Sequence, residues 1–124
     1  MIHIDYQDKR PIYEQVVEKI QTLIVKGAFE KDMKLPSVRA LAIELSINPN
    51  TIQRAYAELE SNGFIYTVKG RGNFVSAKEN YMDNERDLAL QQVRKAAKQA
   101  MQLDIEENVV QKIVAKCYAG EENQ

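Results

Sequence analysis

The sequence predicts a mainly α-helical chain that carries one small β-hairpin. Two observations support this fold class. Apolar residues recur at helical spacing in five separate segments of the 124-residue chain. Two short runs rich in β-branched and aromatic residues also flank a glycine-containing turn at residues 69–72. We expect one domain over residues 1–78 and a tail of two helices over residues 79–124.

The first helix is expected over residues 11–26. Residues 2–6 before it alternate like a short strand or an extended arm. Pro11 suits the first turn of a helix, because its missing N–H would have no partner there, and Gly27 supplies the end. The apolar positions of the helix form one face: Ile12, Val16, Ile20, Leu23 and Ile24.

Two short helices follow, separated by a tight break at residues 46–47. Ser37 and Asn48 can cap them, Pro49 suits the first position of the second, and Gly63 ends it. Two short helices joined by a few residues form the helix-turn-helix pattern. The first of them has the apolar stripe Val38, Leu41, Ala42 and Leu45.

A β-hairpin is expected directly after these helices. Its strands, at residues 64–68 and 73–76, flank the run Lys69-Gly70-Arg71-Gly72, whose glycines permit a positive φ. A hairpin in this place is a wing, so residues 1–78 are predicted to form a winged helix-turn-helix domain. The glycine run lacks P-loop spacing and precedes a strand rather than a helix, which argues against a nucleotide site.

The tail is expected to contain a polar linker at 77–84, a helix over 84–102 and a last helix that ends near Tyr118. Asp104 and Glu107 form a capping-box-like start for the last helix. Two amphipathic helices cannot bury both apolar faces alone, so we expect pairing with a second copy; the alternative is that the tail packs on its own first domain. The expected dimerisation residues are Leu90, Val93, Ala97, Met101, Val109, Val110, Ile113 and Val114.

Charge is distributed unevenly along the chain. The net charge of −1 and the pI of about 5.9 argue, taken alone, against a nucleic-acid partner. Residues 34–78, however, hold six basic and three acidic residues, giving +3, whereas residues 79–124 hold six and nine, giving −3. The middle of the chain is therefore locally basic, and the acidity lies in the tail.

Composition argues against several classes of function. No apolar run approaches the ~20 residues of a membrane span, and no signal peptide opens the sequence, so a cytoplasmic protein is expected. Cys117, the single cysteine, is expected to be a small buried residue of the last helix. His3 is the single histidine, and no nucleophile–base pair or metal-ligand spacing is present. We expect no enzyme, no metal and no cofactor.

The third helix carries the most informative surface. On a helical wheel, Ile52, Ala55, Tyr56 and Leu59 fall on one side, and Asn50, Arg54, Ala57 and Ser61 fall on the other, with Gln53 beside them. Asn or Gln can bond adenine in two places, and Arg can do the same with guanine. Thr51, in the first turn, suits a phosphate.

Basic residues flank this helix on both sides in the sequence. Lys69 and Arg71 at the wing tip suit a phosphate strand or the minor groove. Arg39 follows the Ser37 cap and is placed for a phosphate or a groove edge, or is an ordinary solvated arginine. The candidate DNA-binding set is Ser37, Arg39, Asn48, Asn50, Thr51, Gln53, Arg54, Lys69, Gly70 and Arg71.

Three stretches, Pro11–Gln15, Lys34–Ala42 and Asn48–Tyr56, resemble the N-terminal domain of GntR-family bacterial transcription regulators. The resemblance covers about residues 10–76 in register. It implies a winged helix-turn-helix homodimer on a pseudo-palindromic double-stranded operator. The family's DNA-contacting positions then fall on Arg39, Asn48, Asn50, Thr51, Gln53 and Gly70. Many members carry arginine where this chain has Pro49 or Gln53, so their base preferences do not transfer.

The Asn-Pro-Asn-Thr form at residues 48–51 resembles the short-tailed YtrA-type branch of that family. This branch is often associated with ABC-transporter operons, which implies repression there. The tail of 46 residues is smaller than the effector domains of most branches, so a small-molecule effector is left open. The alternative function is a winged-helix protein-interaction module without specific DNA binding, with the acidic tail as its docking surface.

Overall fold

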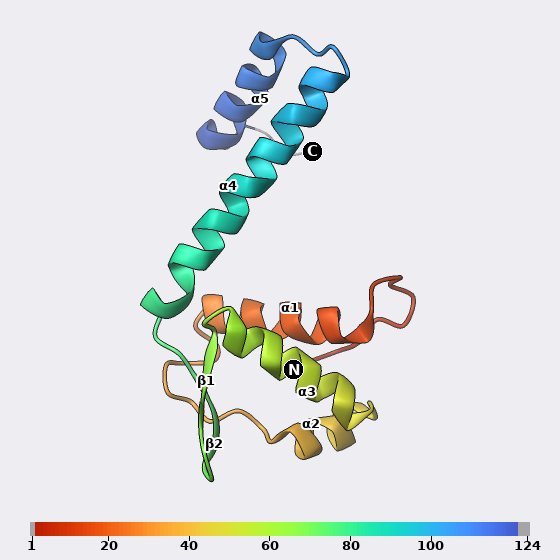
Figure 1. The fold of residues 1–124 in the computed structure, drawn as a ribbon, viewed down its shortest axis with the longest axis vertical. Helices are drawn as coiled ribbons and strands as arrows, with labels where there is room; N and C mark the ends of the chain where they lie inside the picture. Colours follow the sequence, from red (N-terminus) through yellow and green to blue (C-terminus); the bar gives the residue numbers. More distant parts are fainter. Residues whose placement is uncertain (1, 122–124) are drawn as a thin grey trace. The chain divides into compact units, whose positions relative to one another are not determined.

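A computed structural model describes residues 2–121. Within them it contains α1 (Ile12–Val25), α2 (Val38–Leu45), α3 (Pro49–Ser61), β1 (Ile65–Val68), β2 (Gly72–Val75), α4 (Glu79–Gln102) and α5 (Glu107–Ala119) (Figure 1). The mainly helical fold with one hairpin is confirmed. The chain forms two compact units, of which one ends at Asn84 and the other begins at Glu85. None of the helices in the described part is both long and apolar enough to span a bilayer.

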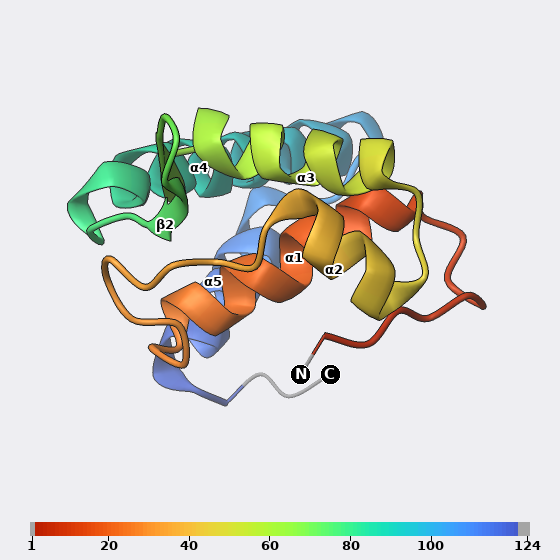
Figure 2. The ribbon, with the colours of Figure 1, turned by 90° about the horizontal axis from the view of Figure 1, so that it is seen from below.

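The core of the first unit lies between α1, α2 and α3. Figures 1 and 2 show α1 and α3 side by side, with α2 next to the N-terminal part of α3. The predicted inner face of α3 is confirmed, since all four of its residues are buried. The side chains at the centre are at most 1% exposed: Val16, Ile20, Leu41, Ile52 and Leu59.

Both caps of the helix-turn-helix form as predicted. The Ser37 hydroxyl oxygen accepts from the backbone N–H of Ala40 at 3.0 Å, and Asn48 Oδ1 accepts from the N–H of Asn50 at 2.8 Å. Each cap satisfies a backbone donor that the first helical turn leaves without a partner. Between the helices, Ser46 takes a left-handed φ of 55°, which makes the turn tight.

The wing is a two-stranded antiparallel hairpin in which Ile65 pairs with Val75 and Val68 pairs with Gly72. The second strand begins one residue earlier than predicted, because Gly72 joins the ladder. A third segment, which the sequence did not predict, also pairs with the wing. The α1–α2 connector lies against β2, with Leu35 N donating to Asn73 O at 2.8 Å and Val75 N donating to Met33 O at 2.9 Å.

The N-terminal segment predicted as a strand or extended arm forms no strand, since residues 2–5 have no regular secondary structure and Tyr6 lies in a turn. It is fixed to α1 by Gln15, which is 1% exposed. The Gln15 side chain accepts from Asp5 N at 2.9 Å and donates to Asp5 O at 3.0 Å. This pair of hydrogen bonds satisfies a buried amide and explains why a polar residue can stand between α1 and the arm.

The predicted linker at 77–84 is wrong in part, because α4 already begins at Glu79. Tyr81, which is 5% exposed, stacks on Phe64 with ring centroids 4.5 Å apart. Gly63, with a φ of +84°, lets the end of α3 approach the backbone of Asn80. Residues 79–84 therefore belong to the first unit, whose boundary lies six residues beyond the predicted position between residues 78 and 79.

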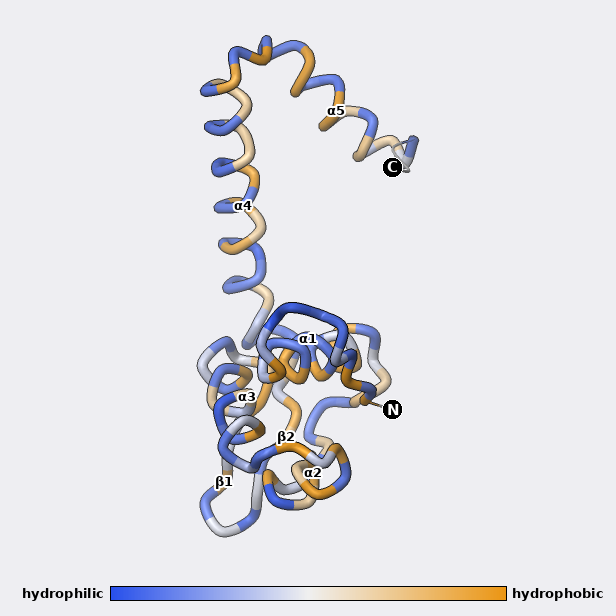
Figure 3. Tube along the Cα trace, turned by 90° about the vertical axis from the view of Figure 1, so that its right-hand side faces the viewer, coloured by the Kyte–Doolittle hydropathy of each residue, from blue (hydrophilic) through white to orange (hydrophobic). Residues whose placement is uncertain are grey.

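The second unit contains the rest of α4 and α5, joined by a short turn. The predicted start of the last helix near Asp104 is wrong: Asp104 has a left-handed φ of 60°, and α5 begins at Glu107. Its N-cap, Glu106, makes no side-chain cap hydrogen bond. Figure 3 shows hydrophobic and hydrophilic residues alternating along both helices. Cys117 is exposed, contrary to the prediction, because no described element of this unit covers its face of α5.

Candidate nucleic-acid interface

The outer face of α3 carries the polar residues that the helical wheel predicted. Asn50, Gln53 and Arg54 are exposed, as are Ala57 and Ser61 further along the same helix. Thr51 is half-buried in the first turn. Because Asn48 uses its oxygen for the cap, its side-chain N–H groups remain as donors at the start of the helix. The N-terminal half of α3 therefore presents three amide side chains and one guanidinium.

Arg54 has a position that the sequence did not predict. Its guanidinium lies 3.8 Å from the centroid of the Tyr13 ring, so the side chain is turned toward α1. A shallow depression of about 410 Å³ lies beside this contact, bounded by Pro11, Ile12, Tyr13, Asn50, Thr51 and Arg54. A cation over an aromatic ring is held by the negative face of the ring, so Tyr13 orients Arg54.

Arg39 and Ser37 lie at the start of α2. Arg39 is exposed and makes no ion pair with any residue in the described part of the chain. The oxygen of Ser37 is engaged in the cap, but its hydroxyl hydrogen is still available to an acceptor such as a phosphate. Both side chains therefore retain donors for an external anion.

The wing tip brings the remaining predicted residues together. Lys69, Gly70 and Arg71 are exposed, and the turn is closed by Arg71 N donating to Val68 O at 2.9 Å. Gly70 has a φ of +78° that favours glycine. Lys34, which was not among the predicted residues, has a side chain that runs beside Gly72 and adds a third cation to the wing. Lys34 could have been identified as a candidate only from its place in the connector, if the pairing of this connector with β2 had been known.

Two tyrosine hydroxyls tie these elements to one another. Tyr56 of α3 donates to Pro36 O at 2.7 Å, and burial together with the nearby Glu44 carboxylate raises the pKa of Tyr56 to about 12. Tyr66 of β1 donates to Asp32 Oδ1 at 2.7 Å, and this hydrogen bond raises the pKa of Tyr66. The connector between α1 and α2 is thus bonded to α3 and to both strands of the wing.

The tail residues predicted for dimerisation are left uncovered. Val93 is 59% exposed, Met101 70% and Ile113 51%, and Val110 is half-buried. Leu90, Ala97, Val109 and Val114 are exposed as well. A cleft of about 320 Å³ between α4 and α5 is lined by Ala97, Ala100, Met101, Ile105, Glu107 and Val110. Apolar side chains exposed in such a row mark a surface suited to a partner.

A capped pair of helices, an exposed polar face on the second of them and a basic hairpin define a winged helix-turn-helix module. This module is the architecture of a large class of DNA-binding regulators. Residues 12–75 match the family model of bacterial regulatory proteins of the gntR family. The HTH-type transcriptional repressor YtrA of Bacillus subtilis (strain 168) is 41% identical over 96 residues, which are 76% of this chain and 74% of the relative.

Solved structures agree with this match. A GntR family transcriptional regulator from Listeria monocytogenes superposes with a TM-score of 0.67 at 43% identity, covering 88% of this chain and 96% of that one. The structure of AraR(DBD) in complex with operator ORX1 gives a TM-score of 0.56 at 31% identity, covering 60% and 96%. The chain belongs to the GntR family of bacterial transcription regulators. The predicted placement in its YtrA-type branch is confirmed.

Proposed function

We propose that this chain is a transcriptional repressor that binds a pseudo-palindromic double-stranded operator as a homodimer. The observation that carries the proposal is the exposed polar face of α3 between α2 and the basic wing. Two named relatives support it. AraR(DBD) was solved on operator DNA, and the B. subtilis relative is named a repressor. The YtrA-type likeness further suggests that the regulated genes form an ABC-transporter operon.

We assign base recognition to Asn50 and Gln53, whose amides match the donor and acceptor edge of adenine. Asn48 stands beside them at the helix start. Arg54 was expected to match guanine, but its contact with Tyr13 turns it toward α1, so we assign it to a phosphate at the edge of the groove. Sequence would then be read by the amides, and Arg54 would contribute affinity.

The remaining predicted residues are assigned to the DNA backbone. Ser37, Arg39 and Thr51 offer hydroxyl and guanidinium donors near the starts of α2 and α3, where phosphates are commonly bound. Lys69 and Arg71 at the wing tip, together with Lys34 beside Gly72, follow a phosphate strand or enter the minor groove. Gly70 carries no side chain, so the backbone of the tip can approach the DNA closely.

We assign dimerisation to the apolar faces of α4 and α5. The side chains of these faces are exposed in the single chain, and a second copy could cover them by two-fold pairing. A dimer would supply two recognition helices to half-sites about one helical turn apart. A single chain offers only one such helix. Pairing of two chains would therefore account both for the exposed apolar faces and for the two-fold symmetry of the proposed operator.

The DNA assignment is tested by titrating labelled duplexes from the region upstream of the gene at several salt concentrations. We expect specific binding with a negative slope of log affinity against log salt. Arg54→Ala should weaken binding to all sequences alike and reduce the slope by about 1, whereas Gln53→Ala should cost about 1–3 kcal/mol at one base pair. Ser61→Ala, exposed at the far end of α3, is the control.

Two outcomes would contradict the DNA assignment. Binding that shows no sequence preference at any salt concentration would favour a protein-interaction module instead. A loss confined to one base pair in Arg54→Ala would return that side chain to base recognition. Footprinting on the bound region then gives the operator and its symmetry.

The dimer assignment is tested by sedimentation of the full chain, whose protomer mass is 14.2 kDa. We expect a dimer, and we expect Val93→Glu to shift it to monomer, since a charge in a buried apolar face is costly. Gln99→Glu introduces the same charge on the opposite side of α4 and should leave the dimer intact. Equal effects of the two substitutions, or a wild-type monomer, would contradict the assignment.

A further inference from the structure

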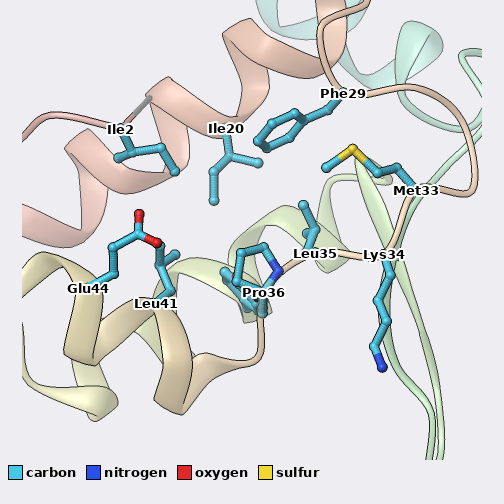
Figure 4. A pocket seen from close by; sticks show the side chains of 10 residues that line it. Ile2, Ile20, Phe29, Met33, Lys34, Leu35, Pro36, Leu41 and Glu44 are labelled. Atoms are coloured by element: carbon cyan, nitrogen blue, oxygen red, sulfur yellow. Dashed lines mark hydrogen bonds between the residues drawn. The ribbon is translucent and has the colours of Figure 1, made fainter.

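The first unit contains an apolar pocket of about 470 Å³ whose lining, apart from Lys34, has no part in the DNA assignment. Figure 4 shows it between α1, α2 and the connector that joins them. Its lining includes Ile20 of α1, Leu41 of α2, and Phe29, Met33 and Pro36 of the connector. Its size falls within the range of small-molecule sites, which are mostly apolar with a few polar groups.

Glu44 gives the pocket its chemical character. Glu44 lines the pocket and is exposed to solvent, whereas the ammonium of Lys34, the other charged lining residue, points away from the other labelled side chains in Figure 4. Within residues 2–121, Glu44 makes neither an ion pair nor a side-chain hydrogen bond. The hydroxyl of Tyr56 is already bonded to Pro36 O, so the lining offers an occupant little beyond apolar surface, aromatic rings and one carboxylate. A ligand that satisfies this set has an apolar body and a cationic group.

The walls of the pocket are also the segment that joins the DNA-facing elements. Met33 O accepts from Val75 N, and Leu35 N donates to Asn73 O, so the connector holds β2 of the wing. Pro36 O accepts from Tyr56 of α3, and α2 begins two residues later. A molecule that enters between Met33, Pro36 and Leu41 therefore presses on the contacts that place the wing relative to α2 and α3.

We propose that this pocket binds small apolar amines and that its occupancy changes operator affinity. The proposal of amine binding rests on the pocket alone, and the proposal of an effect on operator affinity rests on the proposed function. The occupant is an effector bound inside the winged helix domain itself.

Binding is tested by NMR titration of the full-length ¹⁵N-labelled protein with 1-aminoadamantane, which is protonated at pH 7, and with neutral 1-hydroxyadamantane. We expect shifts at the amides of Met33, Leu35 and Leu41, and about two- to fivefold tighter binding of the amine, the range for an ion pair open to water. Glu44→Gln should abolish this preference. Glu30→Gln, the same change in the connector but outside the pocket lining, should keep it.

A substitution that fills the pocket provides a second arm. Met33→Trp should weaken amine binding at least tenfold while the amide spectrum of the tail, which lies outside the pocket, stays unchanged. If Met33→Trp does not fold, the loss or retention of the amine preference in Glu44→Gln still decides whether the site is correct. Equal binding of the two probes, shifts confined to the tail, or no binding would overturn the site.

Regulation is tested by repeating the operator titration with saturating 1-aminoadamantane. We expect at least a fivefold change in operator Kd, the low end of ordinary allosteric coupling. An unchanged operator Kd with a filled pocket would overturn the regulatory half. Absence of operator binding without any amine would overturn that half together with the proposed function, and the NMR titration would still decide on the pocket.

Discussion

Gly63 ends α3 where the chain turns into the wing, and Gly63→Ala should destabilise the first unit strongly. Its φ of +84° costs an alanine about 1–2 kcal/mol. The Cβ of an alanine would also collide with the carbonyl oxygen of Asn80, which is backbone and cannot rotate away. The start of α4 would have to move, and Tyr81 would lose contact with Phe64. Forced backbone shifts of this kind cost about 1–3 kcal/mol, so the total is about 2–5 kcal/mol.

Gly70→Ala is the matched control. Gly70 has a similar φ of +78°, but nothing lies within 4 Å of the position its Cβ would take. Gly70→Ala should therefore lower the free energy of unfolding only by the cost of a left-handed φ, about 1–2 kcal/mol. Urea unfolding followed by circular dichroism measures both free energies of unfolding. Equal losses in the two variants would refute the idea that close approach between α3 and α4 makes Gly63 necessary.

Two further predictions concern the tyrosines that contact α3. Tyr13→Leu should weaken operator binding about two- to fivefold, because a cation–π contact at an exposed site is worth about 0.5–1 kcal/mol. Tyr13→Phe keeps a ring over Arg54 and should bind the operator normally. A gel-shift titration in which both variants lose the same affinity would contradict this role of Tyr13. The pKa of Tyr56 is raised from 10.0 to about 12, so its contribution to stability is present below pH 10 and is lost as the pH rises toward 12. Urea unfolding between pH 7 and 11 should show this loss in the wild type relative to Tyr56→Phe, and parallel curves would contradict it.

The helices and their buried faces were predictable because apolar spacing and caps are local signals. Ser37, Asn48 and Gly63 each mark a helix end through the chemistry of a few neighbouring residues. The exposed face of α3 follows from the same spacing. The polar residues at its start could therefore be named from the sequence and are exposed as expected.

The features that the sequence did not reveal all depend on contacts between distant segments. The connector pairs with β2 through two short stretches that carry no periodicity of their own. The contact of Arg54 with Tyr13 joins α3 to α1, and a wheel of α3 alone gives it no sign. The early start of α4 depends on Tyr81 reaching Phe64, and the exposure of Cys117 depends on which elements cover α5. The local sequence pattern predicts none of these four features.

The pairing of the α1–α2 connector with β2 has a consequence for synthesis of the chain. Leu35 and Asn73 are 38 positions apart, so the contact cannot form until both have been made. Such non-local pairing is slow compared with helix formation. At roughly 5–20 residues per second, the 44 residues from Ser76 to the end of α5 at Ala119 take roughly 2–9 s to add. The winged domain therefore has time to close before α5 is finished, and we expect each chain to fold its own wing before it can meet a partner.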